Sequence, residues 1–420
     1  MTTVRALIAT TVKKGWCISQ LDVNNAFLHG DLNEEVYMQV PPGLVVDKPT
    51  LVYKLNKSLY GLKHTRYTHS MNDYSLFYKK DGNTSVYVAV CVDDVLLTRS
   101  DQEEIIQLKD FLNEQFRIKD LGQLHYFLRL EVMYKDVGVI ISQRKFVLDM
   151  LKEYNFLDYK PCSSPLDPTI KLKAKESTIL QDPTYDRKLV GKLNFLTNTR
   201  LDIAYSVQHL SQFMQDPREP HLKAAFHMLR YLRNDPTLGI FMSKDADCIV
   251  KAYCDFDWAA YPDSRRSITG YLVLLSNNPI SWKSKKQETI SLSSTEAEYR
   301  ALRKVVGELV WLSRLFEDLI VPYPMPISVL CDSQSALHIA KNPVFHERTK
   351  HIEVDYHFVR DQLQAGLVSL HHIRTDSQLA DILTKALTGI KHSATLGKMF
   401  IALSLYLLLR PFSEFSWRES

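Results

Sequence analysis

The stretch Val88-Ala-Val-Cys-Val-Asp-Asp-Val-Leu-Leu97 sets two adjacent carboxylates between apolar runs. Apolar runs of this length are typical of buried strands. Adjacent carboxylates repel each other and resist burial unless a cation or a hydrogen-bond donor compensates them. Asp93 and Asp94 are therefore predicted at the tip of a tight hairpin within a sheet, where they could hold metal. An ordinary Asp-Asp turn between two strands fits the same residues.

The composition is that of a globular protein with two or three domains. The 420 residues are 45% hydrophobic and 24% charged, and the net charge of +4 permits a polyanionic partner without requiring one. The six cysteines show no CxxC spacing, which predicts free thiols in a reducing compartment and no disulfide-linked partner. No secretory signal is recognisable, and the apolar run 399–409 is too short to span a bilayer. We expect an intracellular protein without a membrane partner.

An acidic residue upstream can complete a site with Asp93 and Asp94. The segment Cys17-Ile-Ser-Gln-Leu-Asp-Val23 has the pattern of a strand with Asp22 near its C-terminal end. Two divalent ions held by converging carboxylates can activate a 3′-hydroxyl and stabilise the leaving pyrophosphate of an in-line displacement. That arrangement needs one Asp at the end of a strand and others on a neighbouring hairpin. These three acids are the predicted catalytic metal ligands.

Three segments around these acids resemble the reverse transcriptase of copia-type LTR retrotransposons. They are Gln20-Leu-Asp-Val-Asn-Asn-Ala-Phe-Leu-His-Gly-Asp-Leu32, Lys57-Ser-Leu-Tyr-Gly-Leu-Lys63 and Tyr87-Val-Ala-Val-Cys-Val-Asp-Asp94. The resemblance, which covers about residues 1–387, implies that Asp22, Asp93 and Asp94 bind two Mg²⁺ ions, with Mn²⁺ as a substitute. It implies an RNA template, a DNA primer and dNTPs as partners.

The same resemblance implies a nucleotide site. Phe27 matches the steric gate that excludes a ribose 2′-hydroxyl, and Ala26 beside it would complete the sugar pocket. Tyr60 and Gly61 belong to the second matching segment and are assigned to nucleotide binding with them. A plain core aromatic is the alternative interpretation of Phe27.

The chain departs from the family pattern at three places. The fingers residues that grip the incoming triphosphate lie upstream of the first segment in the family and are expected to be absent. About four turns of helix are missing between Tyr67 and Asn72, and losing a helix that covers a sheet exposes apolar surface. Arg129 stands where the family has glycine, at an expected tight bend. We therefore expect DNA synthesis to be weak or absent.

The pattern of elements predicts a multidomain protein of the α+β and α/β classes. The expected parts are a partial polymerase palm at 1–160 (an antiparallel sheet with helices), a linker and helical connection at 161–245, a ribonuclease H-like mixed sheet with helices at 246–388, and a tail outside the family at 389–420. Within this layout we expect a helix over 101–118 and only helices over 184–235. Basic residues of the connection could track a phosphate backbone or be solvated: Arg187, Lys188, Lys192, Arg200, Arg230 and Arg233.

A second group of acids follows the predicted elements of the C-terminal part. Strands are expected near 249–255, 267–275, 279–283, 327–332 and 368–373, and helices over 294–319 and 378–387, an order typical of the ribonuclease H fold. Acids fall at Asp255, Glu296, Asp332 and Asp381. Four carboxylates can converge only if cations neutralise them, so a two-metal phosphodiesterase site is predicted. The spacing does not exclude the neighbours Asp257 and Glu298, and surface acids are the alternative.

Four segments around these acids resemble the copia-type ribonuclease H motifs: Tyr253-Cys-Asp-Phe-Asp-Trp-Ala259, Ser293-Ser-Thr-Glu-Ala-Glu-Tyr299, Cys331-Asp-Ser-Gln-Ser-Ala336 and Gln378-Leu-Ala-Asp-Ile-Leu-Thr-Lys385. The resemblance implies that Asp255, Glu296, Asp332 and Asp381 ligate Mg²⁺, two ions in the site. A set of polar residues is predicted to line the path of an RNA–DNA hybrid: Arg265, Arg266, Lys283, Lys285, Lys286 and Gln334.

The leading hypothesis is a fragment of a retrotransposon polyprotein with reverse transcriptase and ribonuclease H modules. Hydrolysis of RNA in RNA–DNA hybrids is expected to be retained in preference to DNA synthesis. Such a protein would act in the cytoplasm, within a virus-like particle, or in the nucleus. A second hypothesis is a decayed, catalytically inactive copy that at most binds nucleic acid, and a third is a hybrid nuclease retained by a host.

Overall fold

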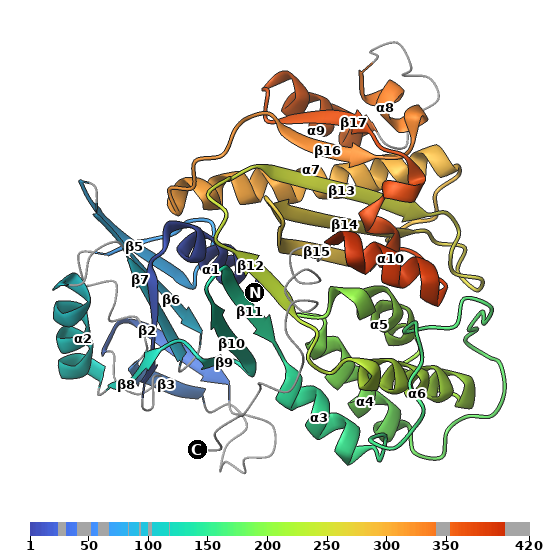
Figure 1. The fold of residues 1–420 in the computed structure, drawn as a ribbon, viewed down its shortest axis with the longest axis horizontal. Coiled ribbons are helices and arrows are strands. Elements are labelled where there is room, and N and C mark those ends of the chain that lie inside the picture. The colour runs from blue at the N-terminus through green and yellow to red at the C-terminus, as the bar shows by residue number, and fades with distance from the viewer. Residues whose placement is uncertain are drawn as a thin grey trace. The chain divides into compact units, whose positions relative to one another are not determined.

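The computed structural model describes residues 1–23, 31–39, 52–57, 67–82, 84–91, 94–99, 103–116, 118–341 and 353–399. The chain forms two compact units (Figure 1). The larger is built from Met1–Ala9, Arg129–Phe316 and the chain from Val321 onward, and the smaller from Thr10–Leu128 with Glu317–Ile320. The segment predicted as a palm therefore contributes to both units. The segments predicted as connection and as ribonuclease H-like domain share the larger one.

The smaller unit is organised on a six-stranded sheet in the order β4-β5-β6-β7-β1-β8, in which neighbouring strands are antiparallel. Its strands are β1 (Cys17–Val23), β4 (Thr68–His69), β5 (Leu76–Asp81), β6 (Thr84–Cys91), β7 (Asp94–Arg99) and β8 (Ile118–Gln123). A separate hairpin pairs β2 (Asp31–Gln39) with β3 (Val52–Lys57). The strand predicted over 17–23 is confirmed, and so is the hairpin, since β6 ends at Cys91 and β7 begins at its register partner Asp94.

Helix α2 (Glu103–Phe116) covers one face of this sheet, as the apolar spacing over 101–118 predicted. Ile105, Leu108 and Leu112 pack against a cluster that includes Val86 and Val88 of β6. Helix α1 (Thr2–Lys14) begins in the larger unit and ends in the smaller one. Residues 3–12 of this helix are all buried, polar and apolar side chains alike.

The larger unit begins with antiparallel strands β10 (Leu130–Lys135) and β11 (Gly138–Ser142), and β11 also pairs with β12 (Ile240–Ser243). Between β9 (Tyr126–Phe127) and β10, Leu128 and Arg129 have φ angles of 48° and 63°. This left-handed region normally favours glycine. The bend predicted at Arg129 is therefore confirmed, and the arginine adopts the conformation that a glycine would accept more easily.

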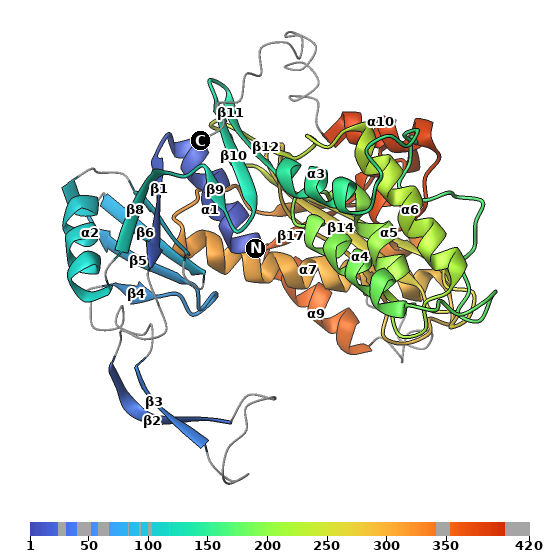
Figure 2. The same cartoon turned by 90° about the horizontal axis from the view of Figure 1, so that it is seen from below.

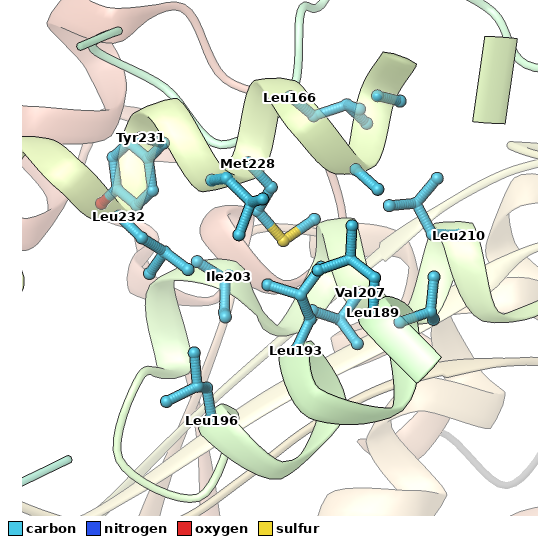
Figure 3. Packing of buried hydrophobic residues seen from close by; sticks show 14 of the residues in the cluster. Leu166, Leu189, Leu193, Leu196, Ile203, Val207, Leu210, Met228, Tyr231 and Leu232 are labelled. Carbon is cyan, nitrogen blue, oxygen red and sulfur yellow. The ribbon is translucent and has the colours of Figure 1, made fainter. Parts of the chain in front are cut away.

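Helices fill the stretch 184–235, as predicted. They are α4 (Pro183–Leu196), α5 (Ala204–Ser211) and α6 (Glu219–Asn234), with a 3-10 turn η3 (Leu201–Ile203) between α4 and α5. Helix α3 (Arg144–Glu153) precedes them. Asp182 caps α4 by accepting the Thr184 N–H at 2.9 Å, and Pro183 occupies the first helical position. The helices share one apolar core in which side chains of α4, α5 and α6 interlock (Figure 3).

A five-stranded sheet in the order β15-β14-β13-β16-β17 forms the rest of the larger unit. Its strands are β13 (Val250–Asp257), β14 (Ile268–Leu275), β15 (Asn278–Lys286), β16 (Ile327–Cys331) and β17 (Val368–His372). The first three are antiparallel, and β13-β16-β17 are parallel. Helix α7 (Ser294–Asp318) follows β15, which confirms the predicted order of the five strands and of the helix expected over 294–319. Two helices, α8 (Gln334–Lys341) and α9 (Glu353–Gln364), lie between β16 and β17 in the chain.

Helix α7 lies beside α9 (Figure 2), where the Tyr299 hydroxyl donates to the Tyr356 carbonyl at 3.4 Å. The turn η7 (Leu379–Leu383) packs its apolar side chains into a cluster with Leu272 and Leu274 of β14. Gly270 on β14 permits this close approach, because a Cβ there would lie 2.6 Å from Thr384 Cγ2 and 2.9 Å from Leu383 Cβ.

The α-helix predicted over 378–387 is wrong. The chain forms two 3-10 turns instead, η6 (Thr375–Ser377) and η7. The Gln378 side chain accepts the Ala380 N–H, and the Thr384 N–H donates to the Asp381 carbonyl at 3.1 Å, the three-residue spacing of a 3-10 turn. An α-helix follows only at α10 (Gly389–Met399), within the segment predicted as a tail, and its residues His392 and Met399 are buried in the larger unit.

Within the described ranges, no helix combines the length and apolar character that crossing a membrane requires. All six cysteines are free thiols, and Cys254 and Cys331 are the buried pair among them.

Candidate active sites

The first candidate site lies in the smaller unit, where β1 and β7 run antiparallel. Asp22 on β1 is the register partner of Asp94, the first residue of β7, and both are half-buried. The Gln20 side-chain amide donates to Asp94 Oδ1 at 2.9 Å and so fixes the position of that carboxylate. The two carboxylates supply oxygen donors of the kind that Mg²⁺ prefers.

The other residues predicted for this site fall outside the described residues. They are Asp93, the third proposed ligand, and the nucleotide-binding set Ala26, Phe27, Tyr60 and Gly61. Their roles stay predictions. At the place of the predicted missing helix, β4 pairs with β5, and Met71 and Tyr74 are 84% and 81% exposed.

A second, more buried group of carboxylates gathers at one end of the five-stranded sheet. Asp255 of β13 is only 2% exposed, and the Thr384 hydroxyl donates to its Oδ2. Burial raises the pKa of Asp255 to about 7. The positive charge of Lys385 opposes this rise, whereas the negative charges of Asp381 and Asp332 add to it, so these acids act on one another electrostatically.

Lys385 bridges two of these three acids. Its Nζ lies 3.2 Å from Asp255 Oδ2 and 3.0 Å from Asp381 Oδ1. Burial alone would lower the pKa of Lys385, but the two carboxylates outweigh it and raise the pKa above its usual value. The ammonium group thus sits between Asp255 and Asp381 and neutralises part of their charge.

Asp332 follows directly after β16 and is oriented from η6. The Thr375 hydroxyl donates to its Oδ2 at 3.1 Å. Since β13 and β16 are parallel, their C-terminal ends meet at the same edge of the sheet, which brings Asp332 toward Asp255. Three of the four predicted acids, Asp255, Asp332 and Asp381, therefore lie together, and we call them the acid group.

The fourth predicted acid, Glu296, has other partners. Its Oε1 forms an ion pair with Arg300 Nη2 at 2.7 Å, and its Oε2 accepts the Leu292 N–H at 2.8 Å. Glu298, one half-turn along α7, is 3% exposed and accepts a hydrogen bond from Cys331 Sγ at 2.8 Å. Burial raises the pKa of Glu298, and the charge of Asp332 adds to the rise. The contacts thus place Glu298 closer to the acid group than Glu296.

The sequence leaves Glu298 as an alternative to Glu296, and helical spacing favours Glu298 as the acid that faces the site. Glu298 shares the buried face of α7 with Ala301, Leu302 and Val305, three, four and seven residues further on. Lys385 was missed as a partner of the acids, although it ends the last matching motif. Only the tight η7 turn makes that lysine face Asp255 and Asp381.

The chemistry of the donors fits a divalent cation. Carboxylate oxygens are the ligands that Mg²⁺ and Mn²⁺ take, and carboxylates whose pKa is raised by burial and mutual repulsion are stabilised by a cation. Among the described residues, no three His, Cys, Asp or Glu side chains lie close enough to share one metal ion. The residues that would hold the cation are Asp255, Glu298, Asp332 and Asp381, with Lys385 displaced from its present position.

Four of the six predicted hybrid-path residues line one of two separate cavities. Lys283, Lys285 and Lys286 of β15 line a cavity of about 670 Å³ between that strand and α7, together with Arg300 and Arg303. Arg265, in the turn between β13 and β14, lines a different cavity of about 380 Å³ next to Asp257. Gln334 is the first residue of α8, and Arg266 lies beside Arg265 in the turn.

The basic residues predicted to track phosphates in the connection are engaged within the protein. Arg200 is 1% exposed and forms a buried ion pair with Asp202 at 2.8 Å, so its prediction as a phosphate contact is wrong. Lys188 and Lys192 pair with Glu153. The guanidinium groups of the other three donate to backbone carbonyls: Arg187, Arg230 and Arg233.

Comparison with known proteins identifies relatives of most of the chain. Residues 1–168 match the family model "Reverse transcriptase (RNA-dependent DNA polymerase)". The chain is 42% identical over 403 residues to the retrovirus-related Pol polyprotein from transposon RE1 of Arabidopsis thaliana, a match that covers 92% of this chain and 28% of the polyprotein. It is 30% identical over 308 residues to the putative transposon Ty5-1 protein of Saccharomyces cerevisiae, covering 69% of this chain and all of that protein.

The chain thus spans about 28% of the length of the Pol polyproteins of RE1 and RE2. Among solved structures, the N-terminal RNase H domain of a Mycobacterium tuberculosis protein matches 36% of this chain and 98% of that chain, with 14% identity and a TM-score of 0.25. A likeness at that score supports no assignment.

Proposed function

The chain belongs to the reverse transcriptase family of copia-type retrotransposon Pol polyproteins, and on this premise we propose that its larger unit hydrolyses the RNA strand of RNA–DNA hybrids. The observation that carries the proposal is the acid group at the end of the five-stranded sheet. Buried Asp255 of β13 and half-buried Asp381 of η7 meet half-buried Asp332, which follows β16, and buried Glu298 approaches from α7. Carboxylates accumulate in this way where cations are bound for phosphoryl transfer.

In this proposal the protein side chains hold and orient the reacting groups. Hydrolysis adds water across a phosphorus–oxygen bond and leaves one strand end with a hydroxyl and the other with a phosphate. Mg²⁺, when bound, would act as a Lewis acid on the scissile phosphate. Thr384 fixes Asp255, Thr375 fixes Asp332 and Cys331 fixes Glu298, each by a donated hydrogen bond. Lys385, released from Asp255 and Asp381, can donate to a phosphate oxygen.

Hydrolysis of a labelled hybrid by the full chain tests the proposal. In Mg²⁺ the wild-type chain should cut the RNA strand, and Asp332→Asn should lower the rate at least about a hundredfold. Asp361→Asn, which neutralises an exposed acid of α9, is the matched control and should retain the wild-type rate. Equal rates for Asp332→Asn and wild type would move the active site elsewhere.

DNA synthesis is a second candidate function, because Asp22 and Asp94 face each other across β1 and β7. Extension of a DNA primer on an RNA template, measured for wild type and Asp22→Asn, decides it. We expect little extension compared with hydrolysis. Processive synthesis that Asp22→Asn abolishes would reverse this order.

A chain that binds hybrids without catalysis is the alternative. It is favoured by the ion pairs of Lys385, which already neutralise part of the acid group without a metal. Folded protein that binds a hybrid tightly, yet cuts none of it in Mg²⁺ or Mn²⁺, would support this alternative against hydrolysis.

A further inference from the structure

The segment 166–173, which precedes α4 and lies in the predicted linker, is anchored to the larger unit by two buried leucines. Leu166 and Leu172 are 3% and 1% exposed and belong to the helical core. The Lys173 carbonyl lies 3.0 Å from His221 Nε2, and the Ala174 N–H donates to Asp263 Oδ2 at 2.7 Å. The segment is therefore a fixed wall of the larger unit.

This wall closes one side of the cavity of about 380 Å³ that contains Arg265. The volume is within the usual range for small-ligand sites. Four cations and one carboxylate line it: Lys171, Lys173, Arg265, Lys385 and Asp257. The cavity therefore has an excess of positive charge.

The remaining lining is apolar or aromatic. Leu166, Pro168 and Pro262 contribute to it, and so do Tyr205 and His209 of α5. The His209 ring stacks on Tyr205, with centroids 5.7 Å apart. Burial, with further effects from His221 and Lys286, lowers the pKa of His209 to about 4, so this wall is uncharged at neutral pH. Uncharged aromatic side chains and cations in one cavity suit a nucleotide, which has a flat ring system and a charged phosphate.

The cavity adjoins the acid group directly. Lys385 lines it and also pairs with Asp255 and Asp381. Asp257 follows Asp255 by two residues on β13 and lines the cavity together with Lys171. A strand whose scissile phosphate met Asp255 would have its next nucleotides at this opening.

The turn that carries Arg265 is held in a costly conformation. Ala259 and Arg265 have φ angles of 50° and 51°, although neither is glycine. The Arg265 N–H donates to the Tyr261 carbonyl at 2.8 Å, which maintains the shape. Left-handed residues of this kind cost about 1 kcal/mol or more and concentrate at functional sites.

We propose that this cavity is a subsite for the cut strand of the hybrid, in which Lys171, Lys173 and Arg265 hold a phosphate one or two nucleotides from the scissile bond. The inference rests on the proposed hydrolysis and extends its substrate contacts to the segment 166–173. That segment would then fix the register of the strand over the acids, as a positioning element rather than a catalytic one.

Binding of a fluorescent hybrid to the full chain, measured by anisotropy with EDTA so that no cleavage occurs, tests the subsite. Lys171→Ala should weaken binding about fivefold near 0.1 M salt and reduce the slope of log Kd against log salt by about one. Lys175→Ala removes the same charge from an exposed position that does not line the cavity, and should change Kd less than twofold. Equal effects of the two variants, or no binding by wild type, would overturn the proposal.

A second measurement locates the contact on the nucleic acid. Neutral methylphosphonates are placed singly at each phosphate of the RNA strand. Wild type should lose about fivefold in affinity at one phosphate within two of the scissile bond, and Lys171→Ala should lose nothing further there. Losses that multiply would show that Lys171 acts only through general charge. Because the anisotropy assay needs no cleavage, it still decides whether Lys171 binds the hybrid if the chain proves not to hydrolyse it; the methylphosphonate scan additionally requires the cleavage position of the wild type.

Discussion

Replacing Glu298 and Glu296 by glutamine, one at a time, distinguishes the roles of two acids that lie two residues apart on α7. Glutamine has the shape of glutamate, so Glu298→Gln can still accept the Cys331 Sγ donor and keep the buried side chain in place. What it loses is the negative charge toward a cation. At about 4 Å and an effective dielectric constant near 20, that charge is worth about 4 kcal/mol, or roughly three orders of magnitude in rate. We expect Glu298→Gln to abolish hybrid hydrolysis.

Glu296→Gln should behave differently, because its partners are Arg300 and the Leu292 N–H. An ion pair four residues apart on a helix contributes about 0.3 to 1 kcal/mol to stability. The variant should therefore melt slightly earlier and keep activity within about threefold of wild type.

Rates in saturating Mg²⁺ and thermal melting in Mg²⁺ against EDTA are the two assays. Mg²⁺ should raise the melting temperature of wild type and Glu296→Gln but not of Glu298→Gln, since a ligand stabilises only the state that binds it. Without metal, Glu298→Gln should melt no lower than wild type, because it removes a buried charge repelled by Asp332. Inactive Glu296→Gln together with active Glu298→Gln would refute this reasoning.

Three further predictions concern stability, each measured by urea unfolding. Burial raises the pKa of Asp186 to about 6, and its Oδ1 has no hydrogen-bond partner. The free-energy cost of its charge is therefore absent below about pH 4 and appears as pH rises through 6. Asp186→Asn should remove about 1 to 2 kcal/mol of the fall in stability between pH 4 and 8, and an unchanged pH profile would contradict this. Arg200→Met should cost about 3 kcal/mol or more because it leaves the buried Asp202 carboxylate without its cation and with only the Tyr231 hydroxyl as a side-chain donor. A loss below about 1 kcal/mol would argue against a true buried pair. At Arg129, with its φ of 63°, glycine should be tolerated, whereas the β-branched Arg129→Val should cost about 1 to 2 kcal/mol; equal costs would show that the bend is not what limits this position.

The elements that sequence predicted well are those whose local pattern and tertiary environment agree. The β6–β7 hairpin has apolar runs buried on the sheet, and α2 carries its apolar stripe on the face that covers it. The bend at Arg129 was predicted from a position where glycine was expected, and the backbone angle agrees. In each case neighbours in the chain decide the conformation.

The turn η7 could not be predicted in the same way, because its conformation depends on Gly270 and Asp255 on other strands. A helix over 378–387 has a sensible pattern by itself, but the close approach to Gly270 and the hydrogen bond from Thr384 to Asp255 favour a tighter turn. The same holds for Arg200. Its charge suggests a nucleic-acid contact, but it is buried in an ion pair with Asp202, two residues away.

The acid group shows that the type and spacing of residues predict where a site lies, but not which of two neighbouring acids belongs to it. Motif spacing placed Asp255, Asp332 and Asp381 near one edge because parallel strands end together there. The choice between Glu296 and Glu298 depends instead on which helix face meets β16, and Cys331 on that strand takes Glu298. At the β6–β7 hairpin, strand pairing alone determines that Asp94 lies opposite Asp22. Any function of that pair depends on further residues that strand pairing does not position. The buried acids of the larger unit have their orienting donors around them, and for that reason they are the better basis for a chemical proposal.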